Sequence, residues 1–99
     1  MPEIRQTATF RDWLRTLRNR SAALRIADRI QRMVHGNMGN MGDVRPVGGG
    51  VSELRFDFGP GYRVYFTRRG PTIYLLLCGG DKSTQARDIE TAKRLAKEV

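Results

Sequence analysis

The feature that most constrains this chain is the alternation of apolar and charged residues over positions 51–67, which continues into an apolar run at 73–78. Strand side chains point to opposite faces with a period of two, so the first two stretches each have one apolar and one charged face. The intervening segments, Phe58–Tyr62 and Arg69–Thr72, carry the Gly and Pro that tight reversals need. The pattern predicts three strands, at 51–58, 62–67 and 73–78, in an antiparallel meander.

The third predicted strand, Ile73–Cys78, lacks this alternation because all of its residues are apolar. An apolar run of this length is typical of a strand that is covered on both faces. We therefore expect it to be a central strand.

The charged faces of the first two predicted strands form the first candidate site. If the strands pair through the turn at 59–61, their polar side chains become cross-strand neighbours on one surface. Such a cluster of carboxylates, guanidiniums and a phenol could hold an anion; its members are Glu53, Arg55, Asp57, Arg63 and Tyr65.

Two amphipathic helices are predicted before this sheet, after a short segment at 2–7 that could form a strand. Apolar residues recur with helical spacing up to about Asn19, and again from about Ser21 to His35. Thr9 is a candidate N-cap of the first helix, with Asp12 completing a capping box. Because few residues separate the helices, we expect an antiparallel hairpin on one face of the sheet. The only histidine, His35, is expected to be a cation at a helix C-terminus.

A third helix is predicted at the C-terminus, with Ser83 or Thr84 as its N-cap. The pair Gly79–Gly80 lies between the last strand and this helix, where backbone N–H groups and Lys82 could hold an anion. The glycine-rich segment 36–50 is expected to be neither a helix nor an interior strand. Two readings of this segment stay open: a connection, or a loop that closes over a ligand beside the charged face.

Length and charge narrow the class of protein. A chain of 99 residues predicts one α+β domain over residues 1–99, and the net charge of +8 favours a polyanionic partner, either nucleic acid or an acidic protein. With one Cys and one His, neither a disulfide nor a protein-only zinc site is expected. No segment predicts a membrane span or an apolar leader, so we expect a soluble cytoplasmic protein without a metal or other cofactor.

The chain resembles the RelE/ParE superfamily of bacterial toxins, in particular the addiction-module killer proteins of the HigB-like and phage Gp49-like branch. The resemblance covers nearly the whole chain and is carried by the runs 42–55, 59–65, 75–82 and 87–89. It implies a RelE-like α+β fold with an N-terminal strand, a helix hairpin, a small, mainly antiparallel sheet and a C-terminal helix. It also implies a type II toxin–antitoxin system in which a helix-turn-helix antitoxin holds the toxin inactive.

RelE-like members cleave mRNA in the ribosome, so the resemblance implies an mRNA interferase, that is, a ribosome-dependent endoribonuclease that inhibits translation. Arg63 and Arg55 match the basic strand positions of the family and would clamp the scissile phosphate. The groups that transfer protons are open between Glu53 or Asp57 as the base, Lys82 as the acid, and Tyr65 as a weaker choice. RNA-binding contacts are expected from Arg45, Asp57, Tyr65 and Arg87.

Two other functions stay open at this point. A ParE-like toxin would inhibit DNA gyrase by binding it, without enzymatic activity, and the region 82–89 lacks the His or Tyr that many RNA-cleaving relatives place there. The other is a phage-derived nucleic-acid-binding module without toxicity.

Overall fold

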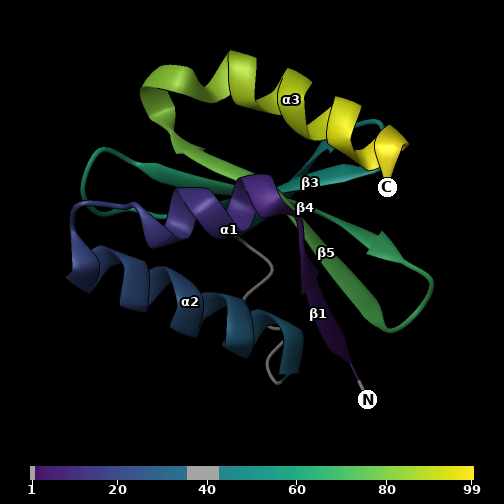
Figure 1. Cartoon of the computed structure of the whole chain (residues 1–99), viewed down its shortest axis with the longest axis horizontal. Coiled ribbons are helices and arrows are strands. Elements are labelled where there is room, and N and C mark those ends of the chain that lie inside the picture. Colours follow the sequence, from purple (N-terminus) through teal and green to yellow (C-terminus); the bar gives the residue numbers. More distant parts are fainter. Residues whose placement is uncertain (1, 36–42) are drawn as a thin grey trace.

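The structure is a computed structural model that describes residues 2–35 and 43–99. A five-stranded sheet in the order β1-β5-β4-β3-β2 forms its centre, with helices on both faces (Figure 1). This confirms the predicted α+β class. The elements in chain order are β1 (Glu3–Gln6), α1 (Ala8–Arg15), α2 (Arg20–His35), β2 (Val44–Gly48), β3 (Val51–Arg55), β4 (Tyr62–Arg69), β5 (Ile73–Asp81), the 3₁₀ turn η2 (Lys82–Thr84) and α3 (Gln85–Glu98).

The sheet is larger than the three strands that the sequence predicts. β3, β4 and β5 pair antiparallel in consecutive order, and β3 ends at Arg55 instead of reaching Phe58. β1 adds one edge by pairing parallel to β5, and β2 adds the other by pairing antiparallel to β3. Part of the glycine-rich segment is thus an edge strand that was not predicted; it tolerates Pro46 because an edge strand leaves backbone groups unpaired.

One face of the sheet packs against α1 and α2. The largest apolar cluster lies there and joins both helices to β3, β4 and β5; its buried members include Phe10, Ile26, Ile30, Met33, Leu54, Val64, Phe66 and Leu76. Gly79 lies on this face, where a Cβ would stand 2.4 Å from the ring of Trp13. A glycine is therefore needed for α1 to approach β5 this closely.

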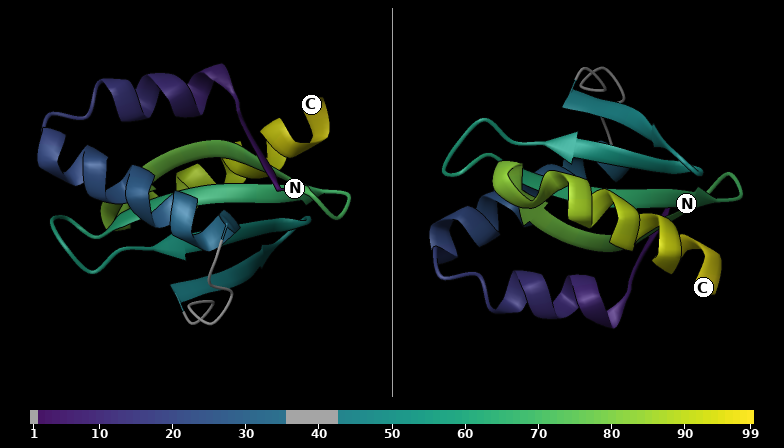
Figure 2. Two further views of the ribbon diagram at one scale, coloured as in Figure 1. Left: turned by 90° about the horizontal axis from the view of Figure 1, so that it is seen from below. Right: turned by 90° about the horizontal axis from the view of Figure 1, so that it is seen from above.

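The opposite face packs against α3, so helices cover the sheet from both sides (Figure 2). A bulge between β4 and β5 pairs Tyr65 with Cys78 and Phe66 with Leu76, which leaves Leu77 as an extra residue. Leu77 and Cys78 both join the cluster under α3. The uniform apolar character of residues 73–78 is thereby explained, and the predicted position of this strand as a covered interior strand is confirmed.

The boundaries of α1 differ from those predicted because other residues cap it. Thr7, not Thr9, is the N-cap of α1, and its hydroxyl accepts a hydrogen bond from the Phe10 N–H. α1 ends at Arg15, and the Arg20 guanidinium donates to three carbonyls at that end, those of Leu14, Arg15 and Leu17. Within the described residues, no helix combines the length and apolar character required to span a bilayer.

Candidate functional site

The predicted charged face exists as one face of the sheet, but most of it is not exposed. Register pairs Glu53 with Arg45 and Tyr65, and pairs Arg55 with Arg63, so these side chains share a face. α3 packs on this same face and covers the end that carries Glu53 and Tyr65. The predicted anion-binding surface is therefore buried at that end, and the face divides into a closed end and an open end.

Glu53 is the centre of the closed end and is 0% exposed. One carboxylate oxygen accepts a hydrogen bond from Arg45 Nε at 3.1 Å. The other accepts from the Tyr65 hydroxyl at 3.1 Å and from the Gln85 amide at 2.7 Å. A buried carboxylate with three donors is satisfied and withdrawn from solvent, which does not fit the predicted role of Glu53 as a general base.

Tyr65 is fully buried beside Glu53, under α3. Burial, followed by the neighbouring Glu53 carboxylate, raises the pKa of the Tyr65 phenol far above its ordinary value. The hydroxyl thus stays protonated and serves as a donor to Glu53. Its burial removes it from the surface that RNA could reach, so the RNA contact predicted for Tyr65 does not fit the structure.

Arg63 lies at the boundary between the two ends, with its side chain 11% exposed. Its Nη1 donates to the carbonyls of Gly61 and Tyr62 at 3.0 and 3.2 Å. Its buried Nε has no hydrogen-bond partner among the described residues and lies 3.9 Å from the nearer carboxylate oxygen of Glu53. The guanidinium is thus held from two sides while its edge reaches the pocket described next.

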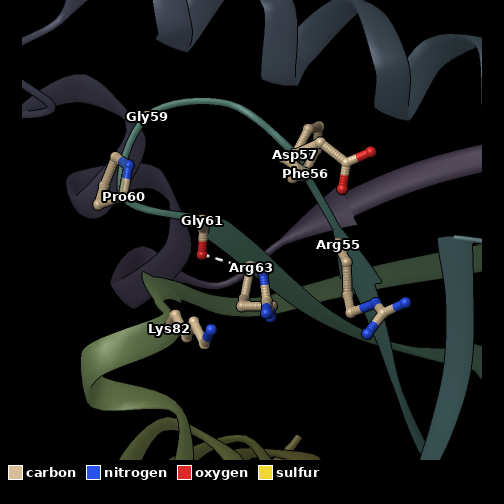
Figure 3. A pocket seen from close by; sticks show the side chains of 8 residues that line it. All are labelled: Arg55, Phe56, Asp57, Gly59, Pro60, Gly61, Arg63 and Lys82. Carbon is tan, nitrogen blue, oxygen red and sulfur yellow. Dashed lines mark hydrogen bonds between the residues drawn. The ribbon is translucent and has the colours of Figure 1, made fainter.

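The open end of the face is a pocket of about 410 Å³ beyond the N-terminus of α3. Figure 3 shows Arg63 between Lys82 and Arg55, with Asp57 farther along the loop that follows β3. The lining residues are Arg55, Phe56, Asp57, Gly59, Pro60, Gly61, Arg63 and Lys82. Of the predicted catalytic residues, the structure thus brings together Arg55, Arg63 and Lys82, joined by Asp57 but not by Glu53.

A tight turn shapes one wall of this pocket. The Gly61 N–H donates to the Phe58 carbonyl at 3.2 Å, and Gly59 and Gly61 have φ of 60° and 79°. Left-handed backbone of this kind favours glycine. A Cβ on Gly61 would stand 3.5 Å from Arg63 Nη1, which is an ordinary contact, so the backbone conformation and not a lack of space requires glycine here.

Lys82 enters the pocket from the turn that precedes α3. The Asp81 carboxylate caps this turn by accepting hydrogen bonds from the N–H and the hydroxyl of Ser83. These bonds, the hydroxyl's above all, hold the pKa of Asp81 below its ordinary value. Asp81 therefore occupies the N–H groups that were predicted to bind an anion, and Gly80 instead makes room for Asp88. Thr84 is the N-cap residue of α3, one of the two predicted, although its side chain makes no capping hydrogen bond.

The remaining predicted residues lie outside the pocket lining. Arg45 is 55% exposed and pairs with Glu53 at the closed end, whereas Arg87 is 76% exposed on α3 near Asp88. His35, exposed at the end of α2, also does not line the pocket. Gln85 was missed by the sequence analysis, and no local pattern distinguishes it, because its role depends on α3 docking above β3.

In the described part of the chain, few residues are suited to metal binding or to thiol chemistry. No group of three or more His, Cys, Asp and Glu residues there could hold a metal ion. The Cys78 thiol is buried under α3, and burial raises its pKa to about 12. Cys78 is thus a packing residue in its thiol form.

Comparison with known proteins places the chain in a family. Residues 12–97 match the family of phage-derived Gp49-like proteins (DUF891). An uncharacterized protein of Haemophilus influenzae (strain ATCC 51907 / DSM 11121 / KW20 / Rd) is 47% identical over 97 residues, which cover 98% of this chain and 95% of that protein. The Gp49-like family is part of the RelE-like toxin–antitoxin group and is associated with toxins. This chain belongs to the phage-derived Gp49-like family.

Proposed function

We propose that this protein is the toxin of a type II toxin–antitoxin module and cleaves mRNA in the ribosome. In this proposal the pocket at the open end binds the scissile phosphate. The reaction needs positive charge on the transition state, a group that takes the 2′ proton and a group that protonates the leaving 5′ oxygen. The pocket contains residue types suited to each need.

The pairing of Arg55 with Arg63 is the observation that carries this proposal. The two residues are direct cross-strand partners, and like charges in that position destabilise a sheet. Among the described residues, no carboxylate lies within ion-pair distance of Arg55, and Glu53 approaches Arg63 only to 3.9 Å. Two guanidiniums that line the same open pocket favour a bound anion, and arginine suits phosphate because of its planar fork of donors.

The proton-transfer roles fall to the two other charged residues of the pocket. Asp57 is an exposed carboxylate that can accept the 2′ proton, and Lys82 is an exposed ammonium that can donate to the 5′ oxygen. As the 2′ oxygen attacks phosphorus, the bond from phosphorus to the 5′ oxygen breaks. The products are a 2′,3′-cyclic phosphate and a free 5′ hydroxyl, with Arg55 and Arg63 neutralising the phosphate oxygens.

Glu53 supports this site as a positioning residue. Its carboxylate lies 3.9 Å from Arg63 Nε and is itself held by Arg45, Tyr65 and Gln85. A phosphate-binding guanidinium gains from being held in place before the substrate arrives. The negative charge of Glu53 also compensates the positive charge of the nearly buried Arg63.

The family further suggests an antitoxin as the partner that restrains the toxin. We propose a helix-turn-helix protein encoded beside it, with an acidic segment that covers the pocket. The net charge of +8 complements such a segment and would speed association. Binding of the antitoxin should then block access to Arg55 and Lys82.

Mapping the 3′ ends of cellular mRNA after brief induction tests the proposed activity. The wild-type protein should produce cuts at fixed positions within codons, and Arg63→Ala and Arg55→Ala should abolish them. Arg94→Gln is the matched control, because Arg94 is exposed on α3 and is not among the residues that line the pocket. Far-UV circular dichroism of each purified variant checks that the fold is intact.

Two outcomes would refute the nuclease. Intact mRNA together with arrested DNA synthesis would favour the gyrase alternative. Intact mRNA with unchanged growth would point instead to a nucleic-acid-binding module without toxicity.

A further inference from the structure

A second pocket adjoins the first and is not used in the proposed chemistry. It has a volume of about 340 Å³ and lies between α2 and the loop that follows β3. Arg55, Phe56 and Asp57 line both pockets and form the wall that they share. The remaining lining residues are Arg25, Asp28, Arg29, Arg32, Asp43 and Phe58.

The charges of this second pocket are only partly paired. Asp28 pairs with Arg32 at 3.1 Å, and Asp43 pairs with Arg29 at 3.4 Å. No carboxylate of the described residues lies within ion-pair distance of Arg25 or Arg55. Among the described residues of this pocket, the guanidiniums without an ion pair are thus Arg55, at the shared wall, and Arg25, on α2, and they could contact successive phosphates of one strand.

Arg25 also forms a flat surface in this pocket. Its guanidinium carbon lies 3.7 Å from the centre of the Phe58 ring, so the two groups stack. Arg25 is exposed and Phe58 is partly buried. Stacking on Phe58 orders the long side chain of Arg25, which would otherwise be free to move. Stacked arginine and aromatic groups are surfaces on which proteins place the bases of single-stranded nucleic acid.

We infer that the second pocket binds the nucleotides that flank the scissile phosphate on a single-stranded RNA. One strand would pass from Lys82 and Arg63, across Arg55, to Arg25 and Phe58. The inference rests on the proposed function, because the bound polymer is the RNA that the first pocket cleaves. It adds a binding subsite and predicts that affinity depends on the length of the strand.

Binding of uncleavable RNA to the free full-length protein tests this inference without any ribosome or cleavage. The probes are a fluorescent dinucleotide and a fluorescent hexanucleotide with 2′-O-methyl groups, measured by anisotropy at several salt concentrations. Arg25→Gln should weaken hexanucleotide binding about tenfold, the loss expected for one stacked base. It should also reduce the salt slope by about 0.7, the value for one phosphate contact on a single strand. Dinucleotide binding should stay unchanged.

The controls separate a local site from a general charge effect. Arg94→Gln removes one exposed charge from α3, which packs on the face of the sheet opposite α2, and should leave the preference for the hexanucleotide intact. An equal loss in Arg25→Gln and Arg94→Gln, or an equal loss for both probes, would overturn the inference. So would Arg25→Gln weakening an acidic peptide but not RNA, because the pocket would then be a protein-binding site.

The proposed function can fail separately from this inference. Length-dependent binding through Arg25 without mRNA cleavage in cells would support the subsite and refute the nuclease. Cleavage that requires Arg55, together with RNA binding that does not depend on Arg25, would support the nuclease and refute the subsite.

Discussion

The two ends of one sheet face show how the same strands can produce a buried network and an open site. At the closed end, Glu53 and Tyr65 are cross-strand partners under α3, and both oxygens of the Glu53 carboxylate accept hydrogen bonds. At the open end, two residues along each strand, Arg55 and Arg63 are partners beside a pocket of about 410 Å³. Both pairs come from the same alternation of charged residues. The two pairs differ because the first turn of α3 covers Glu53 and Tyr65 but not Arg55 and Arg63.

The difference shows what each set of charges does. Charges at the closed end are matched, so they stabilise the docking of α3 on the sheet. Charges at the open end are mostly positive, with Asp57 as the one carboxylate of the described residues in the pocket lining and Glu53 no nearer than 3.9 Å to Arg63, which costs stability unless a ligand supplies more negative charge. Substitutions at the closed end should therefore mainly lower stability. Substitutions at the open end should mainly lower activity.

The largest effect on stability is expected at Glu53. Replacing it by Ala leaves the Tyr65 hydroxyl, the Gln85 amide and the nearly buried Arg63 without their shared partner, and should lower the free energy of unfolding by about 3 kcal/mol. Urea denaturation measures this change. Glu53→Gln retains a hydrogen-bond acceptor and should cost less, about 1.5 kcal/mol. Equal stability of wild type and Glu53→Ala would show that the network contributes nothing.

Ala variants of the two glycines of β5 test whether the two faces of the sheet depend on different helices. A Cβ on Gly80 would stand 1.8 Å from the Asp88 carboxylate, and a Cβ on Gly79 would stand 2.4 Å from the Trp13 ring. Each Ala variant should lose about 2 kcal/mol because the packed groups must move. Only Gly79→Ala should shift the fluorescence of Trp13, the sole tryptophan. A fluorescence shift in Gly80→Ala would mean that the two faces are coupled.

Much of the fold could be predicted because it depends on local patterns. The alternation at 51–67 and the helical spacing of apolar residues indicate β3, β4, α1 and α2 directly. β2 was missed because its glycines and Pro46 are typical of a loop, and it becomes a strand only by pairing with β3. Its preceding residues 36–42 lie outside the described part of the chain, so the expectation of a closing loop there stays a prediction.

The candidate site could be predicted only in part for a similar reason. Register follows from the pattern, so the shared face of Arg55 and Arg63 was expected. Exposure does not follow from the pattern, because it depends on where a helix more than thirty residues later docks. Glu53 therefore lies in a buried network instead of the pocket, and Gln85 could not have been identified beforehand.

A smaller effect that depends on pH is expected at Asp81, which caps the turn carrying Lys82. Its carboxylate is held below its ordinary pKa chiefly by the Ser83 hydroxyl, so the ionised form stabilises the folded state above that ordinary value. This stability is lost as the pH falls through the ordinary pKa towards the lowered one. Asp81→Ala should lower the free energy of unfolding by about 1 kcal/mol at pH 7. The difference from wild type should shrink at pH 3, and a constant difference would exclude the ionised cap.

The smallest effect on stability, and a large one on activity, is expected at Arg55. This residue is exposed, faces Arg63 and pairs with no carboxylate of the described residues, so Arg55→Ala should change the free energy of unfolding by less than about 0.5 kcal/mol. Loss of one guanidinium from the proposed transition state should nevertheless slow RNA cleavage about a hundredfold. Thermal denaturation and cleavage of a ribosome-bound mRNA measure the two effects on one preparation. A variant that loses stability and activity together would place Arg55 with the closed end, as a structural residue, and would remove the reason for assigning the pocket to phosphate.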